Sequence, residues 1–173
     1  MLSGRLIETY LHSGVIKCNV PSSELKVGEN SVDVTLSDTF LVPIRDHRVH
    51  RLGDVRFHQV VQEEYILPPG AFVLGCVRER FEVQGGIVQL YEGRSTVARS
   101  GLFTHLSAGF GDVGFSGAFT LELFNCSPWS LELVVGDRVG QISFVRVEGP
   151  LGSGYNGVYN APSVRGPKGV GEL

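Results

Sequence analysis

Residues 91–128 combine side chains that could bind and transform an anionic substrate. The segment Gly93-Arg94-Ser95-Thr96 offers backbone N–H groups, two hydroxyls and a guanidinium, which together suit a phosphate group. Asp112 lies in a Gly-Asp-Val-Gly loop, whose small neighbours let a ligand approach the backbone closely. Glu122 falls within an alternating strand pattern at residues 119–124, where a carboxylate is either a solvated outer-face residue or a catalytic base. The pattern therefore indicates phosphate binding and acid–base chemistry within one short span.

Short alternating strands separated by turns must position these side chains. We expect strands at residues 15–20, 31–36, 40–42, 64–67, 71–77, 81–83, 87–90, 119–124, 131–135 and 139–145. One amphipathic helix is predicted at residues 3–14, with Ser3 as its cap and Gly14 at its end. The 173 residues suffice for one domain with its own core. The expectation is a mainly β domain, a barrel or a sandwich, followed by a Gly- and Pro-rich flexible arm at residues 149–173.

Several residues outside the central span have a simpler interpretation. Residues 43–62 are rich in Arg and His and are expected to form a solvated loop, because the His47-x-x-His50 pair has no third metal ligand at a convincing spacing. The three cysteines are predicted to be buried free thiols in a reducing compartment. Asp33 is expected to face solvent and Trp129 to lie in the core.

Composition excludes several classes of function. The net charge is -3 and the pI is about 5.9, so no nucleic-acid partner is expected. We find no signal peptide and no apolar run long enough to span a membrane, which predicts a cytoplasmic protein without a membrane partner. An anionic ligand would then be held by local arginines.

Six segments together resemble the dCTP deaminase family, part of the trimeric dUTPase-like superfamily. The resemblance extends over essentially the whole chain, and its most specific segments are residues 92–102 and 108–117. The others are residues 31–36, 67–75, 120–125 and 139–142.

The resemblance implies a distorted β-barrel of the β-clip type, assembled as a homotrimer with active sites between subunits. It implies dCTP as substrate, dUTP as product, Mg²⁺ carried by the triphosphate with no metal ligands from the protein, and dTTP as a feedback inhibitor. Zinc is not expected, because the H-x-E and P-C-x-x-C signature of zinc deaminases is absent.

Residue roles also follow from the resemblance. Glu122 corresponds to the general base and acid for the attacking water, Ser95 and Arg99 to residues that position it, and Ala108 to a backbone group that helps to hold it. Asp112 corresponds to the residue that meets the 3′-hydroxyl, and Phe115 to an aromatic packed where a 2′-hydroxyl would clash. The predicted substrate-binding residues are Arg94, Thr96, Asp112, Phe115, Gln141, Tyr155, Tyr159, Arg165 and Lys168.

Departures from the family pattern affect whether the final product is expected to be dUTP or dUMP. Gly111 stands where an isoleucine is usual, and with Val113 it predicts a looser loop around Asp112. Val158 and Val164 replace a lysine and a glutamine of the tail. Deaminase-only members of the family more often have a bulky His-Arg pair at the positions of Gly109 and Phe110, so the smaller residues here are expected to leave room for a second water near the α-phosphate, which Asp112 could orient. The main prediction is deamination of dCTP to dUTP and ammonia. The alternatives are a bifunctional enzyme that forms dUMP and pyrophosphate, and a dUTPase-like regulatory trimer without deaminase activity.

Overall fold

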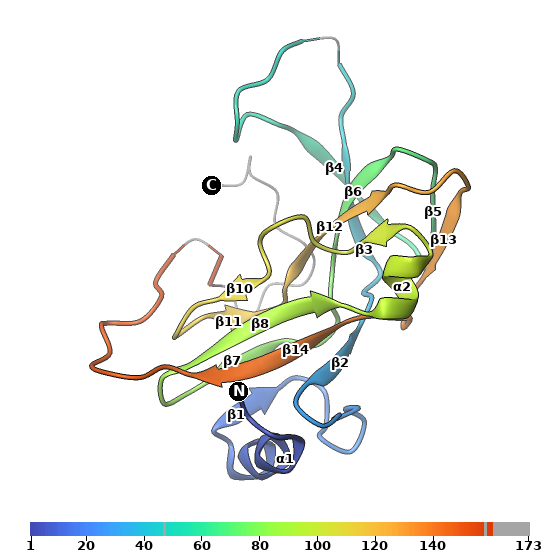
Figure 1. The fold of residues 1–173 in the computed structure, drawn as a ribbon. Helices are drawn as coiled ribbons and strands as arrows, with labels where there is room; N and C mark the ends of the chain where they lie inside the picture. The colour runs from blue at the N-terminus through green and yellow to red at the C-terminus, as the bar shows by residue number, and fades with distance from the viewer. Residues whose placement is uncertain (47, 158, 161–173) are drawn as a thin grey trace.

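The computed structural model describes residues 1–46, 48–157 and 159–160, and it is built mainly from β-strands (Figure 1). Its helices are α1 (Gly4–Ser13) and α2 (Ser95–Arg99). Its strands are β1 (Ile16–Cys18), β2 (Val32–Thr35), β3 (Thr39–Pro43), β4 (Phe57–Val61), β5 (Glu64–Leu67), β6 (Phe72–Cys76), β7 (Phe81–Val83), β8 (Ile87–Gly93), β9 (Leu102–Phe103), β10 (Phe110–Gly111), β11 (Ser116–Gly117), β12 (Thr120–Asn125), β13 (Leu131–Val134) and β14 (Arg138–Arg146). The predicted mainly β fold is confirmed.

Most of the strand residues belong to two antiparallel sheets. One has the strand order β10-β8-β14-β2, and the other has the order β4-β3-β6-β12-β9. In the first sheet β14 pairs with β8 on one side and with β2 on the other. Two smaller sheets, β1-β7-β11 and β13-β5, complete the strands. Segments distant in sequence are thereby brought side by side, and the span from β8 to β12 borders both large sheets.

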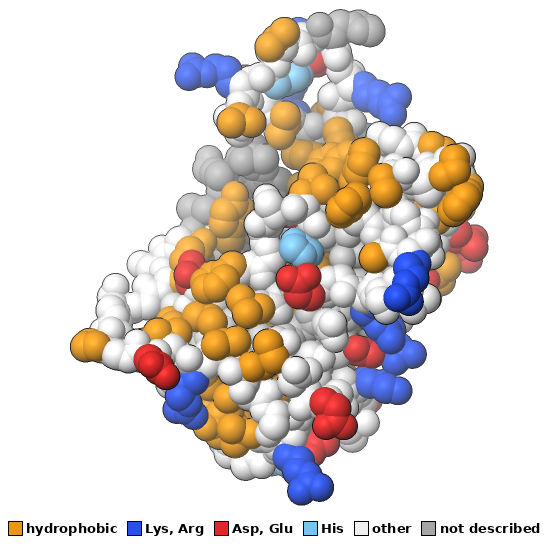
Figure 2. Space-filling view, in the orientation of Figure 1, with side chains coloured by type: hydrophobic (Ala, Val, Ile, Leu, Met, Phe, Trp, Pro, Cys, Tyr) orange, Lys and Arg blue, Asp and Glu red, His pale blue; other side chains and the backbone are white. Residues whose placement is uncertain are grey.

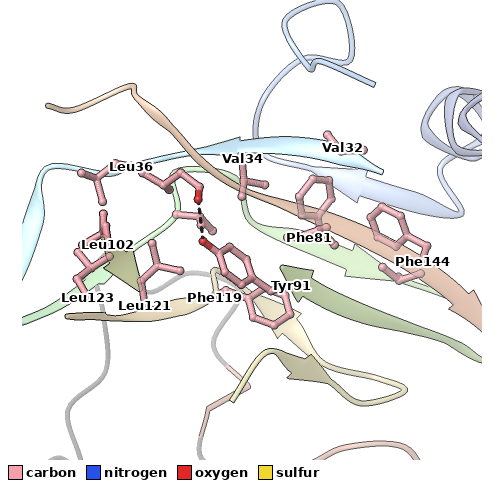
Figure 3. Packing of buried hydrophobic residues seen from close by; sticks show 14 of the residues in the cluster. Val32, Val34, Leu36, Phe81, Tyr91, Leu102, Phe119, Leu121, Leu123 and Phe144 are labelled. Carbon is pink, nitrogen blue, oxygen red and sulfur yellow. Dashed lines mark hydrogen bonds between the residues drawn. The ribbon is translucent and has the colours of Figure 1, made fainter. Parts of the chain in front are cut away.

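Alternating side chains of these sheets meet in one hydrophobic core (Figure 3). Tyr91 on β8 lies at its centre, and its hydroxyl donates a hydrogen bond to the carbonyl of Val139 at 3.4 Å. Burial raises the pKa of this phenol above its ordinary value. A Cβ at residue 140 would lie 2.3 Å from the Tyr91 ring, so Gly140 allows β14 to approach it. Each fully buried large side chain contributes about 1.5–3 kcal/mol to folding.

The predicted N-terminal helix is present as α1. The chain enters it through a hydrogen bond from the Leu2 N–H to the Phe144 carbonyl, at 2.7 Å. Ser3 occupies the N-cap position, although its side chain makes no capping hydrogen bond. Gly14 ends the helix with a φ of 77°, a left-handed conformation that glycine adopts without strain. Ile7 is fully buried and fixes the helix to the core.

Four details differ from the sequence prediction. Residues 57–61 form strand β4 rather than loop, because they pair with the outer edge of β3 and Val60 packs on the core. A second helix, α2, occupies residues that we predicted as a turn. Trp129 is 56% exposed, because it follows β12 in the turn before β13. Cys126 is also exposed, whereas Cys76 is buried and burial raises the pKa of the half-buried Cys18 thiol to about 11.

Candidate functional site

Glu122 lies on the outward face of β12, between two leucines that point into the core. Leu121 and Leu123 are fully buried, while Glu122 is half-buried. Its Oε2 accepts a hydrogen bond from the backbone N–H of Leu106 at 3.1 Å. This contact ties the segment that follows β9 to the carboxylate, and Ala108 is two residues further along that segment. The structure therefore brings the backbone near Ala108 towards Glu122.

The expected phosphate-binding residues lie where β8 ends and α2 begins. The Ala98 N–H donates to the Arg94 carbonyl at 2.9 Å, which closes the first turn of this short helix. Ser95, Thr96 and Arg99 are all exposed. Among the described residues, neither Ser95 nor Arg99 makes a side-chain hydrogen bond or ion pair with Glu122. Ser95 and Arg99 are therefore exposed on α2, whereas Glu122 lies on β12.

Arg94 is held by a carboxylate that sequence reasoning assigned to solvent. Asp33 lies opposite Gln141 in the β2–β14 pairing, and its side chain is only 16% exposed. Its Oδ2 accepts a hydrogen bond from Arg138 Nη1 at 3.0 Å and lies 3.7 Å from Arg94 Nη2. The single carboxylate of Asp33 is thus shared between two guanidinium groups, which fixes both side chains at this end of the sheet.

Gln141, also predicted to bind substrate, makes an internal contact here. Its Oε1 accepts a hydrogen bond from the Ser31 hydroxyl at 3.0 Å. Because Gln141 and Asp33 face one another across β14 and β2, the two residues share this part of the sheet. The amide nitrogen of Gln141 remains the part of the side chain that could donate a hydrogen bond to a ligand.

Asp112 and Phe115 close a tight loop between β10 and β11. The Phe115 N–H donates to the Asp112 carbonyl at 2.9 Å, and Gly114 adopts a φ of 89°. The Asp112 carboxylate is exposed, whereas the Phe115 ring packs 5.4 Å from the Phe119 ring. The loop therefore presents a carboxylate beside an aromatic face.

Gly109 and Gly111 both lie close against other parts of the protein. A Cβ at residue 109 would lie 2.6 Å from the Tyr91 carbonyl oxygen. A Cβ at residue 111 would lie 3.0 Å from the Phe115 ring and 3.2 Å from the Gln89 side chain. These glycines permit close packing of β10 against β8.

The predicted tail residues fall into two groups. Tyr155 lies against the Asp112 loop, where its N–H donates to the Val113 carbonyl at 2.6 Å. The Tyr159 N–H donates to the Tyr155 hydroxyl at 3.3 Å, and the Tyr159 side chain is partly exposed. Arg165 and Lys168 lie outside the described residues.

His105 packs beneath the candidate site. Its ring meets Tyr91 edge-on at 5.4 Å, and its Nε2 lies 3.7 Å from Glu92 Oε2. Its Nδ1 is buried and has no hydrogen-bond partner among the described residues. The edge-on contact packs the His105 ring against the core residue Tyr91.

A cavity of about 380 Å³ lies beside α2, and Arg94 and Arg138 are among the residues that line it. Neither Ser95, Thr96, Arg99 nor Glu122 lines it. Within the described ranges, no three His, Cys, Asp or Glu residues gather closely enough to hold a metal ion. No helix in that same part of the chain is long and apolar enough to cross a membrane.

Comparison with known proteins assigns this chain to a family. A sequence profile described as "dCTP deaminase-like" matches residues 1–147. The "dCTP deaminase, dUMP-forming" of Kocuria rhizophila is 36% identical over 169 residues, which cover 91% of this chain and 87% of that protein. The protein of the same name from Thermobifida fusca is 35% identical over 176 residues, covering 98% of this chain and 89% of that one.

A solved structure agrees at the level of the fold. The 2′-deoxycytidine 5′-triphosphate deaminase of Agrobacterium tumefaciens superimposes with a TM-score of 0.65 and 17% identity. The match covers 83% of this chain and 45% of that one. With the profile and the sequence relatives, this likeness leads to one conclusion: the chain belongs to the dCTP deaminase-like family.

Proposed function

We propose that this protein hydrolytically deaminates dCTP and cleaves the triphosphate, so that dCTP and two waters give dUMP, ammonia and pyrophosphate. One observation supports dUMP, rather than dUTP, as the final nucleotide product. The sequence relatives that match nearly the full chain at 34–36% identity are named as dUMP-forming dCTP deaminases. The bifunctional alternative therefore replaces our main prediction, in which the reaction stopped at dUTP.

In the deamination step, Glu122 acts as general base and then as general acid. One carboxylate oxygen is engaged by the Leu106 N–H. The other, Oε1, has no hydrogen-bond partner among the described residues and is available for a water. The carboxylate would remove a proton from the water that attacks C4, and then deliver it to the departing amine. General acid–base catalysis of this kind contributes about 10²–10⁴-fold to a rate.

The phosphate-binding role falls to the start of α2. Arg94, Ser95 and Thr96 offer a guanidinium and two hydroxyls at the point where β8 ends. Asp33 holds the Arg94 side chain in place, and Arg138 offsets the Asp33 charge. Mg²⁺ would arrive with the triphosphate and neutralise part of its charge.

Hydrolysis of the triphosphate needs a second water, and Asp112 is the exposed carboxylate of the sugar-binding loop. In this proposal Asp112 meets the 3′-hydroxyl. Arg94, Ser95 and Thr96 would hold the triphosphate for attack by that water, and Mg²⁺ would supply neutralisation of the phosphate charge.

A homotrimer with sites between subunits would explain two features of the single chain. Ser95 and Arg99 are exposed without contacting Glu122, so a neighbouring copy could complete the set. Large apolar side chains are also exposed around β9 and β10, and Figure 2 shows hydrophobic side chains gathered over this part of the molecule. The principal members are Phe103, Leu106, Phe110 and Trp129, each at least half exposed.

The experiment is a substrate panel. Purified protein is incubated with dCTP, CTP, dUTP and dTTP in Mg²⁺, and ammonia and pyrophosphate are measured separately. The proposal expects both products from dCTP, no ammonia from dUTP or dTTP, and loss of both activities after chelation until Mg²⁺ alone is restored. Activity that returns only with zinc, or the absence of ammonia from dCTP, would contradict it. The regulatory-trimer alternative predicts nucleotide binding without either product.

A further inference from the structure

The loop from Asp112 to Ser116 is fastened by two amide side chains from distant parts of the chain. Gln89, on β8, donates through Nε2 to the Phe115 carbonyl at 3.1 Å. Asn160, which follows β14 by fourteen residues, accepts the Ser116 N–H at Oδ1 at 2.9 Å. Its Nδ2 lies within hydrogen-bonding distance of the Gly114 carbonyl, at 3.4 Å. Three consecutive residues of the loop are therefore bonded to groups outside it.

Gln89 supports the loop from the core side. It is 1% exposed and lies directly opposite Gly111 in the β8–β10 pairing. Because residue 111 has no side chain, the Gln89 chain fills the space beside it, under the Phe115 ring. The Gln89 Oε1 has no hydrogen-bond partner among the described residues, which is costly for a buried amide. Within the part of the chain that the structure describes, the hydrogen bond to the loop is the one that this side chain makes.

Asn160 supports the loop from the outer side. Its Nδ2 also reaches the Tyr155 carbonyl at 3.3 Å, and the Tyr155 N–H donates to the Val113 carbonyl at 2.6 Å. The Tyr155 and Phe115 rings meet edge-on at 6.2 Å. Residues 154–157 and 159–160 thus lie along the loop, with Asn160 as the side chain that joins the two backbones.

We propose that Gln89 and Asn160 are positioning residues, which hold the Asp112 carboxylate and the Phe115 ring in the geometry that selects a 2′-deoxyribose. The inference rests on the proposed function, in which this loop meets the sugar. Asp112 and Phe115 are joined by the Phe115 N–H bond, so a shift of the loop moves the 3′-hydroxyl partner and the aromatic face together. Loosening the loop then weakens binding of dCTP and admits CTP, while the chemistry at Glu122 on β12 is left intact.

The first test compares Asn160→Ala with Asn156→Ala. Asn156 is exposed in the same segment and makes no side-chain hydrogen bond within the described ranges, so it is a matched control. Asn160→Ala is expected to raise KM for dCTP about fivefold, the effect of losing about one ordinary hydrogen bond, with kcat changed less than twofold. The preference for dCTP over CTP in kcat/KM should fall by a similar factor. Equal kinetics in both variants, or a loss confined to kcat, would overturn the proposal.

A second test does not depend on turnover. Hydrogen–deuterium exchange at the Ser116 amide should accelerate about fivefold in Asn160→Ala and remain unchanged in Asn156→Ala. Gln89→Met keeps the side-chain volume and removes the unpaired Oε1, so its melting temperature should not fall while exchange at the loop increases. If the protein does not act on dCTP but the exchange differs as stated, the proposed function and the selection of the sugar fail, whereas the role of Asn160 in holding the loop stands. Unchanged exchange in Asn160→Ala refutes the positioning role whatever the activity.

Discussion

Replacing Glu122 by Gln tests the assignment of the base with little change to the fold. The amide has the shape of the carboxylate, and its oxygen can still accept the Leu106 N–H that Oε2 accepts at 3.1 Å. A hydrogen bond to a charged acceptor is worth about 1.5–3 kcal/mol and one to a neutral acceptor about 0.5–1.5 kcal/mol. Since Glu122 is partly exposed, the substitution should cost at most about 1 kcal/mol of stability, or about 2–4 °C in melting temperature for a chain of this size.

The effect on catalysis should be far larger. An amide cannot take the proton of the attacking water, so kcat for ammonia release should fall about 10²–10⁴-fold. KM for dCTP should change little, because the phosphates and the sugar are bound by other residues. Ammonia release is measured under saturating dCTP, with nucleotide binding followed by calorimetry. Glu64→Gln, an exposed glutamate on β5, is the control and should retain full activity. Deamination within tenfold of the wild type in Glu122→Gln would refute the assignment.

Three further predictions follow from packing, charge and assembly. Gly111→Ala should destabilise the protein by about 1–3 kcal/mol in thermal unfolding, because the new Cβ would lie 3.0–3.2 Å from Phe115, Phe119 and Gln89. The control Gly152→Ala should leave stability unchanged, because a Cβ there would meet no atom within 4 Å. The pKa of His50 should be raised above 6.5 in an NMR titration, because its ring lies 2.7 Å from both the Asp46 carboxylate and the Asp54 carbonyl. Protonated His50 therefore stabilises its loop at pH values below the ordinary histidine pKa, and this contribution is lost as the pH rises through the raised pKa. An unshifted pKa of His50 in the wild type, or the same pKa in Asp46→Asn, would contradict this prediction. Sedimentation should give a trimer whose specific activity falls on dilution below its dissociation constant; a fully active monomer would disprove sites shared between subunits.

The strands and the central residues could be predicted from the sequence because their signals are local. Alternation at residues 119–124 predicts the strand observed as β12 and places Glu122 on the face opposite the buried Leu121 and Leu123. Gly14 likewise marks the end of α1 without any knowledge of the rest of the fold. Strand β4 was missed because the Arg and His residues around it have the composition of a solvated loop, while the pairing with β3 that makes it a strand is tertiary.

The supporting contacts of the site could not be predicted because each joins residues far apart in the chain. Asp33 and Arg138 are 105 positions apart and meet only through the β2–β14 pairing. Gln89 appears as an ordinary strand residue until β10 brings Gly111 opposite it. Two features of the sequence could have drawn attention to Gln89: it is a polar residue in an otherwise apolar strand, and Gly111 stands where the family usually has a larger residue. Asn160 carried no comparable signal in the Gly- and Pro-rich tail.

The most direct test of the central claim is the stoichiometry of products during a single turnover of dCTP. Enzyme in excess over dCTP, with Mg²⁺ present, is quenched at intervals, and ammonia, pyrophosphate, dUTP and dUMP are quantified together. The account predicts one ammonia and one pyrophosphate for each dCTP consumed, with dUMP as the final nucleotide. Quantitative ammonia release with dUTP persisting and no pyrophosphate would contradict it.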